Sequence, residues 1–178
     1  MRIIRGKYKG RKLLPPKEFK ARPTTDFAKE SLFNILENND YLKEAIVLDL
    51  FSGTGSISLE FLSEGCKNIT AVDINRTYTL HIKKQFDEMF PSKGNVVCTD
   101  VFKFCKKQKL NYDIIFADPP FQNENINELP KLIFNNPGLK DHVLFVLEHS
   151  KKYDFSSYEF FKESRKYGNI IFSFFEKK

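Results

Sequence analysis

The fold of this chain is decided by the stretch Ala45-Ile46-Val47-Leu48-Asp49-Leu50-Phe51-Ser52-Gly53-Thr54-Gly55. An apolar run ends here in a loop with two glycines, and a helical pattern follows near 57–64. A short continuous apolar run is typical of a strand buried on both faces. Glycines let the backbone turn sharply and approach a ligand closely. The stretch therefore predicts a strand, a tight loop and a helix, which is how an α/β sheet begins.

Further apolar runs and helical patterns alternate after this stretch. The predicted strands are Ala45–Leu50, Asn68–Asp73, Asn95–Cys98, Tyr112–Ala117 and Val143–Glu148, and the helical patterns lie near 57–64, 76–90, 101–108 and 126–135. This alternation predicts a mostly parallel sheet with helices on both faces. At the end, Phe160–Tyr167 and Asn169–Phe175 meet at Gly168 with no room for a crossover helix. They predict an antiparallel hairpin that completes a seven-stranded sheet.

The first 22 residues differ from the rest of the chain in charge. They hold nine Lys or Arg and one acid, whereas the whole chain carries +6, so the other 156 residues sum to −2. Arg2-Ile3-Ile4 and Arg11–Leu14 resemble short strands, with Gly6 and Gly10 near the reversal. We predict a basic N-terminal β-hairpin extension over 1–22 and one domain over 23–178, whose first helix begins at Thr25 or Asp26.

A local basic patch suits a phosphate backbone, because neutralising phosphates releases counterions. The predicted RNA-binding residues are Arg2, Arg5, Lys7, Lys9, Arg11, Lys12 and Arg22. The alternative is a solvated basic arm with no partner.

Cysteine usage and hydropathy exclude several classes of protein. Cys66, Cys98 and Cys105 are odd in number and lack Cys-x-x-Cys spacing, which disfavours a disulfide scaffold or a zinc site. No apolar run approaches the ~20 residues that span a bilayer, and the N-terminus lacks a signal-peptide pattern. We expect a cytoplasmic protein with no metal and no membrane partner, and nothing in the sequence demands more than a monomer.

Acids follow three of the predicted strands, where ligands bind in open α/β sheets. Asp73 can accept both ribose hydroxyls of an adenosine group, and Asp100 can meet its adenine. Asp49 would repel a pyrophosphate but suits an ammonium, and Ser58 replaces the third glycine of a dinucleotide fingerprint. These features favour S-adenosylmethionine over NAD; the alternative is a purely structural turn. The predicted cofactor-binding residues are Asp49, Phe51, Ser52, Gly53, Thr54, Gly55, Asp73, Ile74, Asp100 and Val101.

The fourth strand leads into Asp118-Pro119-Pro120-Phe121, our predicted catalytic residues. The Asp118 carboxylate and the Pro119 carbonyl can hold the two hydrogens of an exocyclic amine and turn its lone pair toward a sulfonium methyl. The prolines fix φ and remove competing donors, and Phe121 offers a face on which a base can stack. Such chemistry relies on positioning, so we do not expect His149 to act as a base. The alternative is that the two prolines merely end a strand.

With these residues, the chain resembles the RsmD family, the bacterial 16S ribosomal RNA guanine-N2-methyltransferases. The likeness extends from Met1–Leu13 through Arg22–Asp26, Leu48–Gly55 and the Asp118–Phe121 tetrad to Glu148–Lys151 and Tyr167-Gly168. It implies a Rossmann-like class I methyltransferase fold, S-adenosylmethionine as donor, and 16S rRNA in a partly assembled small subunit as substrate. Asp118, Pro119 and Phe121 match the catalytic motif, and Gly53, Gly55 and Asp73 match cofactor positions.

The chain departs from the family pattern twice, and other functions stay open. Phe27 stands where the family usually has a basic residue, and Phe121 replaces a commoner tyrosine but keeps the stacking face. An adenine-N6 methyltransferase of DNA or RNA uses the same tetrad, although 178 residues show no separate target-recognition domain. A non-catalytic RNA-binding assembly protein is the third reading, which four intact acids at positions 49, 73, 100 and 118 disfavour.

Overall fold

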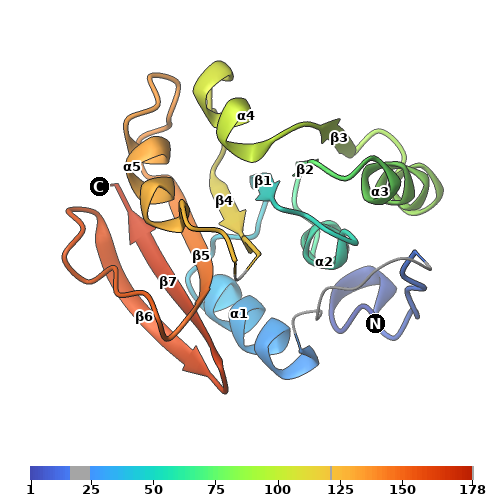
Figure 1. Ribbon diagram of the computed structural model, residues 1–178. Helices are drawn as coiled ribbons and strands as arrows, with labels where there is room; N and C mark the ends of the chain where they lie inside the picture. Colours follow the sequence, from blue (N-terminus) through green and yellow to red (C-terminus); the bar gives the residue numbers. More distant parts are fainter. Residues whose placement is uncertain (17–24, 121, 178) are drawn as a thin grey trace.

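The computed structural model describes residues 1–16, 25–120 and 122–177, and over these residues a seven-stranded sheet runs through the molecule (Figure 1). The strand order is β3-β2-β1-β4-β5-β7-β6. The strands are β1 (Ile46–Leu50), β2 (Asn68–Asp73), β3 (Gly94–Cys98), β4 (Ile114–Ala117), β5 (Leu144–Ser150), β6 (Phe161–Tyr167) and β7 (Ile170–Glu176). The α/β architecture predicted from the alternating pattern is confirmed, and so is the Rossmann-like fold that the resemblance implied.

The direction of the strands is mixed. β3, β2, β1, β4 and β5 pair in parallel, whereas β7 runs antiparallel to both β5 and β6. The chain moves outward from β1 in both directions, to β2 and β3 on one side and to β4 on the other. Strand order therefore reverses between β1 and β4, which is where ligands bind in sheets of this kind.

Helices cover both faces of the sheet (Figure 1). One face is packed by α1 (Asp26–Asn38), α2 (Ser56–Ser63) and α3 (Arg76–Met89), where the Phe33 and Phe61 rings meet edge to face at 4.8 Å. The other is packed by α4 (Val101–Lys107) and α5 (Leu129–Phe134), with Phe145 stacked on Phe175 at 5.3 Å. Successive strand residues point to opposite faces, so the two cores draw on alternate residues of the same strands.

The observed helices agree with the sequence prediction at one place and differ from it at another. Thr25 caps α1 by accepting a 3.2 Å hydrogen bond from the Ala28 amide, as predicted. The helical pattern near 126–135 instead divides into a 3-10 turn, Ile126–Glu128, and α5. Pro130 lies in the first turn of α5, where the lack of an amide proton is tolerated.

The N-terminal segment contains less strand than the sequence predicts. In residues 1–16, one isolated antiparallel bridge joins Arg2 to Lys12, and a 3-10 turn occupies Gly6–Tyr8. Its two arms are joined by backbone hydrogen bonds from the Ile3 amide to Arg11 and from the Leu13 amide to Met1. Two further amides bond to side chains of α2: the Ile4 amide donates to Glu60, and the Tyr8 amide donates to Ser63. The segment is thus fastened onto α2, and it is not a free-standing hairpin.

Candidate cofactor and substrate cavity

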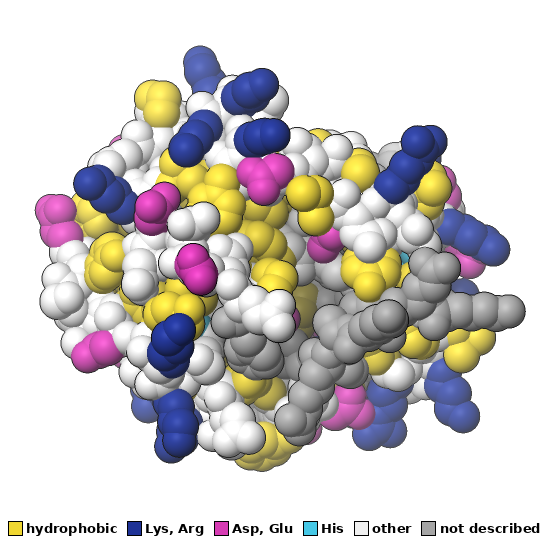
Figure 2. All heavy atoms as spheres, viewed as in Figure 1, with side chains coloured by type: hydrophobic (Ala, Val, Ile, Leu, Met, Phe, Trp, Pro, Cys, Tyr) yellow, Lys and Arg dark blue, Asp and Glu magenta, His cyan; other side chains and the backbone are white. Residues whose placement is uncertain are grey.

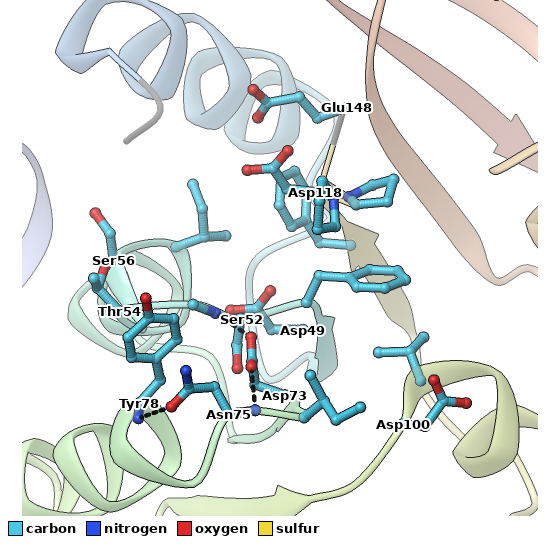
Figure 3. A pocket seen from close by; sticks show the side chains of 18 of the residues that line it. Asp49, Ser52, Thr54, Ser56, Asp73, Asn75, Tyr78, Asp100, Asp118 and Glu148 are labelled. Carbon is cyan, nitrogen blue, oxygen red and sulfur yellow. Dashed lines mark hydrogen bonds between the residues drawn. The ribbon is translucent and has the colours of Figure 1, made fainter. Parts of the chain in front are cut away.

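A cavity of 510 Å³ opens where β1, β2 and β4 end (Figure 3). It is lined by Asp49, Phe51, Ser52, Gly53, Thr54, Ser56, Ile57, Asp73, Ile74, Asn75, Tyr78, Asp100, Val101, Phe116, Asp118, Pro119, Pro120, Gln122 and Glu148. Nearly all the predicted cofactor residues and three of the catalytic tetrad are therefore brought together. Gly55 is not in the lining, and Phe121 lies outside the described residues.

The glycine loop enters the cavity through a turn of left-handed backbone. Phe51, Gly53 and Gly55 have φ of 60°, 52° and 77°. The Gly55 amide donates to the Ser52 carbonyl at 2.7 Å and closes the turn. A Cβ on Gly55 would lie 2.8 Å from Ile82 Cγ1, so α3 packs against the back of the loop. Gly55 shapes the loop from behind, which is why it does not line the cavity.

Asp73 connects the end of β2 to that loop. Its Oδ2 accepts from the Gly53 amide and its Oδ1 from the Asn75 amide, each at 2.8 Å. A carboxylate oxygen has two acceptor sites, so both oxygens keep capacity for further donors. Beside it, the exposed Ile74 side chain offers an apolar surface. Asp73 and Ile74 together suit a sugar with neighbouring hydroxyls and a flat apolar ring.

Asp49 lies deep in the cavity wall, with only 1% of its surface exposed. Ser58 donates to its Oδ2 at 2.5 Å, so the serine that replaces a third glycine supports this acid. Burial raises the pKa of Asp49 to about 7, and the charges of Asp118 and Asp73 contribute. A buried carboxylate among other acids is stabilised by a cation, so the site favours an ammonium and disfavours a phosphate.

Asp118 follows β4 directly, and its amide donates to the Leu50 carbonyl at the end of β1. The ends of these two strands converge, as the proposed chemistry requires. Burial raises the pKa of Asp118 well above its usual range, and the nearby Glu148 adds to the rise. Asp100 has a structural contact as well, because its carboxylate accepts from the Lys103 amide and caps α4.

Several lining residues were not predicted, namely Ser56, Ile57, Asn75, Tyr78, Phe116, Gln122 and Glu148. Asn75 follows Asp73 and caps α3, which a cap signature before the 76–90 pattern would have indicated. Glu148 ends the strand that the sequence predicts over Val143–Glu148, so the rule that found Asp73 would have included it, although β5 itself continues to Ser150.

The predicted RNA-binding residues lie in the N-terminal segment, except that Arg22 is outside the described residues. Arg2, Lys7, Lys9, Arg11 and Lys12 are exposed. Arg5 is only partly exposed and its guanidinium pairs with Glu37 and Glu64, while the exposed Arg2 pairs with Asp26 at 2.9 Å. The role of all these residues in RNA binding stays a prediction. On the face shown in Figure 2, lysine and arginine side chains gather toward the edges and at the top, over α4.

His149 has both ring nitrogens engaged outside the cavity. Nε2 lies 2.8 Å from the Ser173 hydroxyl and Nδ1 lies 2.9 Å from the Ser150 carbonyl, so Nδ1 is the donor and Nε2 the acceptor. Burial lowers the pKa of this imidazole. These contacts give His149 a supporting position between β5 and β7.

The described residues contain neither a cluster of metal ligands nor a membrane-spanning helix. Across 1–16, 25–120 and 122–177, no group of three or more His, Cys, Asp or Glu is arranged to hold a metal ion. Within the same ranges, no helix has the length and apolar character needed to cross a membrane.

Known proteins similar to this chain include several ribosomal RNA methyltransferases. The family model described as "Conserved hypothetical protein 95" matches residues 1–176. "Ribosomal RNA small subunit methyltransferase D" of Escherichia coli (strain K12) is 32% identical over 148 residues, covering 83% of this chain and 74% of that protein. The protein of the same name from Buchnera aphidicola subsp. Baizongia pistaciae is 31% identical over 148 residues, covering 83% and 75%.

Solved structures show the same similarity. A putative methyltransferase from Escherichia coli superimposes with a TM-score of 0.86 and 28% identity, covering 100% of this chain and 98% of that one. An RNA methyltransferase from Salinibacter ruber, solved with S-adenosyl-L-homocysteine, gives a TM-score of 0.66 over 87% of this chain and 93% of that one. At 16% identity, this second likeness extends to the fold alone.

Proposed function

The chain belongs to the RsmD family of ribosomal RNA small subunit methyltransferases, and from that membership we propose that it transfers a methyl group from S-adenosylmethionine to the exocyclic N2 amine of a guanine in 16S rRNA. The observation that carries the proposal is the convergence of β1 and β4, which places Asp118 in the same cavity as the glycine loop and Asp73. Family and cavity point to the same reaction.

The residues of the cavity fit this cofactor. Asp73 keeps acceptor capacity for ribose hydroxyls, Ile74 offers an apolar surface to adenine, and Asp49 favours an ammonium. Asp100 and Val101 complete the adenine side of the proposed site, and Phe51, Ser52 and Thr54 belong to the loop beside the amino-acid part. When bound, the cofactor supplies an electrophilic methyl group on a sulfonium.

The chain's own contribution is to hold the amine. We assign one N–H of the amine to the Asp118 carboxylate and the other to the Pro119 carbonyl, so that the nitrogen lone pair points at the methyl group. Pro119 is buried and Pro120 is exposed on the rim, and neither has an amide proton that would compete. Positioning of this kind lowers the barrier by fixing the geometry of attack. Phe121 remains the proposed stacking partner of the base.

The chemical assignment is tested by Asp118→Ala. We expect methyl transfer to small-subunit rRNA to fall by roughly 100-fold or more, as for loss of a group that acts in the transition state, while cofactor affinity changes little. The exposed Asp141→Ala is the matched control. Digestion of the RNA to nucleosides identifies the product. Transfer near the wild-type rate would refute the role of Asp118, and N6-methyladenosine in place of N2-methylguanosine would refute the guanine assignment.

We propose that the exposed cations of the N-terminal segment contact the RNA backbone, with 1–22 acting as an extension of the 23–178 domain. Deleting 1–14 is a poor test, because Ile3 and Leu13 are buried in the core. Replacing Lys7, Lys9 and Lys12 by Ala leaves the core intact. We expect weaker RNA binding and a slope of log affinity against log salt that is shallower by about 2 to 3. An unchanged slope would exclude the segment from the substrate site.

The physiological context completes the proposal. We propose that the enzyme works as a cytoplasmic monomer and that its substrate is a partly assembled small subunit, in which the target guanine can be unstacked into the cavity. Comparing free 16S rRNA with assembly intermediates as substrates tests this point. Equal methylation rates on both substrates would show that the enzyme does not require a partly assembled subunit.

A further inference from the structure

Glu148 is an acid that the mechanism above does not use. It lies in β5, two residues before the strand ends at Ser150, lines the cavity and has 4% of its surface exposed. The strand that carries it is otherwise apolar from Leu144 to Leu147. Glu148 is thus the acidic side chain that strand β5 contributes to the cavity wall.

The sheet register places Glu148 beside Asp118. Ala117 of β4 pairs with Leu147 of the parallel strand β5, so Asp118 and Glu148 are the next residues along. Cross-strand neighbours project from the same face of a sheet. Figure 3 shows both carboxyl groups pointing into the same part of the cavity. The raised pKa of Asp118, to which Glu148 contributes, is the electrostatic sign of this closeness.

Asp49 has a different position and different contacts. It lies one strand further away, on β1, where its register partner is Phe116 of β4 and Ser58 holds one of its oxygens. It belongs to the cofactor half of the cavity. Glu148 lies on the far side of Asp118 from Asp49, because the strand order is β1-β4-β5. A base that offers its amine to Asp118 therefore presents its neighbouring edge atoms toward Glu148.

The two purine edges differ next to the reactive amine. Beside N2, guanine has an N1–H donor, whereas beside N6, adenine has an N1 lone pair. Flipped bases are read by hydrogen bonds to this edge, and a carboxylate can only accept. We infer that Glu148 is the specificity-determining residue of this site, accepting the N1–H of guanine and repelling the N1 lone pair of adenine.

With Glu148, the cavity offers three acceptors to the three N–H bonds of the guanine edge: the Asp118 carboxylate, the Pro119 carbonyl and the Glu148 carboxylate. Adenine would leave Glu148 facing a lone pair, and buried polar groups without a partner are what makes such sites discriminate strongly. The inference deepens the proposed function and rests on it. Its test must therefore separate the choice of base from the transfer of the methyl group.

The probe is 2-aminopurine, which keeps the reactive N2 amine but has a lone pair at N1. The target guanine is first mapped as N2-methylguanosine, and rRNA with 2-aminopurine at that position is then prepared. We expect the wild-type enzyme to prefer guanine by roughly 30-fold or more. Glu148→Gln, whose amide can donate to N1, should reduce this preference at least about tenfold. The same change at an exposed site, Glu88→Gln, should leave it unchanged.

The outcomes separate the two proposals. No methylated guanine from the wild-type enzyme would refute the proposed function itself. Guanine methylation together with use of 2-aminopurine within threefold would refute only the role of Glu148, and this comparison needs no variant to fold. Equal loss of both activities in Glu148→Gln, with cofactor binding intact, would reduce Glu148 to a structural residue and also overturn the inference. Glu148→Asp should retain the guanine preference at a lower rate.

Discussion

The substitution Lys29→Met tests how the N-terminal segment is fastened to the domain. Lys29 lies on α1 with 1% of its side chain exposed, and its Nζ donates to Glu60 Oε1 at 2.8 Å and to the Arg2 carbonyl at 2.7 Å. Glu60 in turn accepts from the Ile4 amide. This ion pair therefore joins α1, α2 and the first residues of the chain in one buried network.

The expected loss in the free energy of unfolding follows from the buried groups that each substitution leaves without a partner. Methionine fills much of the lysine volume but leaves the Glu60 carboxylate buried without its counter-ion, which costs about 3–5 kcal/mol. For a chain of this length, that lowers Tm by roughly 6–20 °C. Adding Glu60→Leu removes the stranded charge and leaves the Ile4 amide, together with the Arg5 amide that also faces Glu60, without this acceptor, at about 1–3 kcal/mol for a buried amide. The double variant should thus be more stable than the single one.

Urea unfolding at pH 7 measures these differences, with the exposed Lys83→Met as the control that should change stability by less than about 1 kcal/mol. Burial already raises the pKa of Glu60, and Lys29 opposes that rise. Without Lys29 the pKa rises further, so protonation stabilises the folded variant and its deficit shrinks as pH falls from 7 toward 5. A single variant within 1 kcal/mol of wild type, or a double variant no better than the single, would refute the reasoning.

Two further predictions concern the cavity, and a third concerns His149. Because burial raises the pKa of Asp49 to about 7 and an ammonium favours its charged form, cofactor affinity should fall up to about tenfold for each pH unit below 7; calorimetry checks this, and Asp49→Asn should abolish the dependence. Gly55→Ala should cost about 1–3 kcal/mol in backbone strain and weaken cofactor binding through the contact with Ile82, whereas Gly10→Ala, whose Cβ would meet nothing within 4 Å, should cost only the strain. His149→Gln should lower Tm yet keep kcat within threefold. A larger fall in kcat would show that the imidazole takes part in catalysis.

The sheet could be predicted because its signal is local. Each parallel strand is a short apolar run, and the acids that follow such runs converge once the strands are parallel. Asp49, Asp73 and Asp118 were therefore predicted for the cavity from sequence alone, and the structure places all three there. The N-terminal hairpin was predicted from equally short runs, but the Ile4 and Tyr8 amides bond to Glu60 and Ser63, which lie more than fifty residues away. Local patterns contain no information on such contacts.

Glu148 shows a different limit. Its neighbour His149 is the residue type that suggests catalysis, and the sequence does not reveal that both of its nitrogens are engaged by Ser150 and Ser173. The proximity of Glu148 to Asp118 depends on the β4–β5 register, which joins residues thirty positions apart. A one-residue shift would turn the carboxylate to the other face of the sheet.

The strand order also explains how one edge can serve two ligands. The sheet carries four acids at or near the carboxyl ends of the consecutive neighbours β2, β1, β4 and β5, namely Asp73, Asp49, Asp118 and Glu148. At about 4.8 Å per strand, the row spans roughly 14 Å. In our proposal the two acids on the β2–β1 side meet the cofactor and the two on the β4–β5 side meet the base. The reacting atoms then lie above the β1–β4 boundary, where the strand order reverses and no crossover helix covers the edge. An acid at each strand end thus divides the cavity into a donor half and an acceptor half, and the methyl group has only to cross the boundary between them.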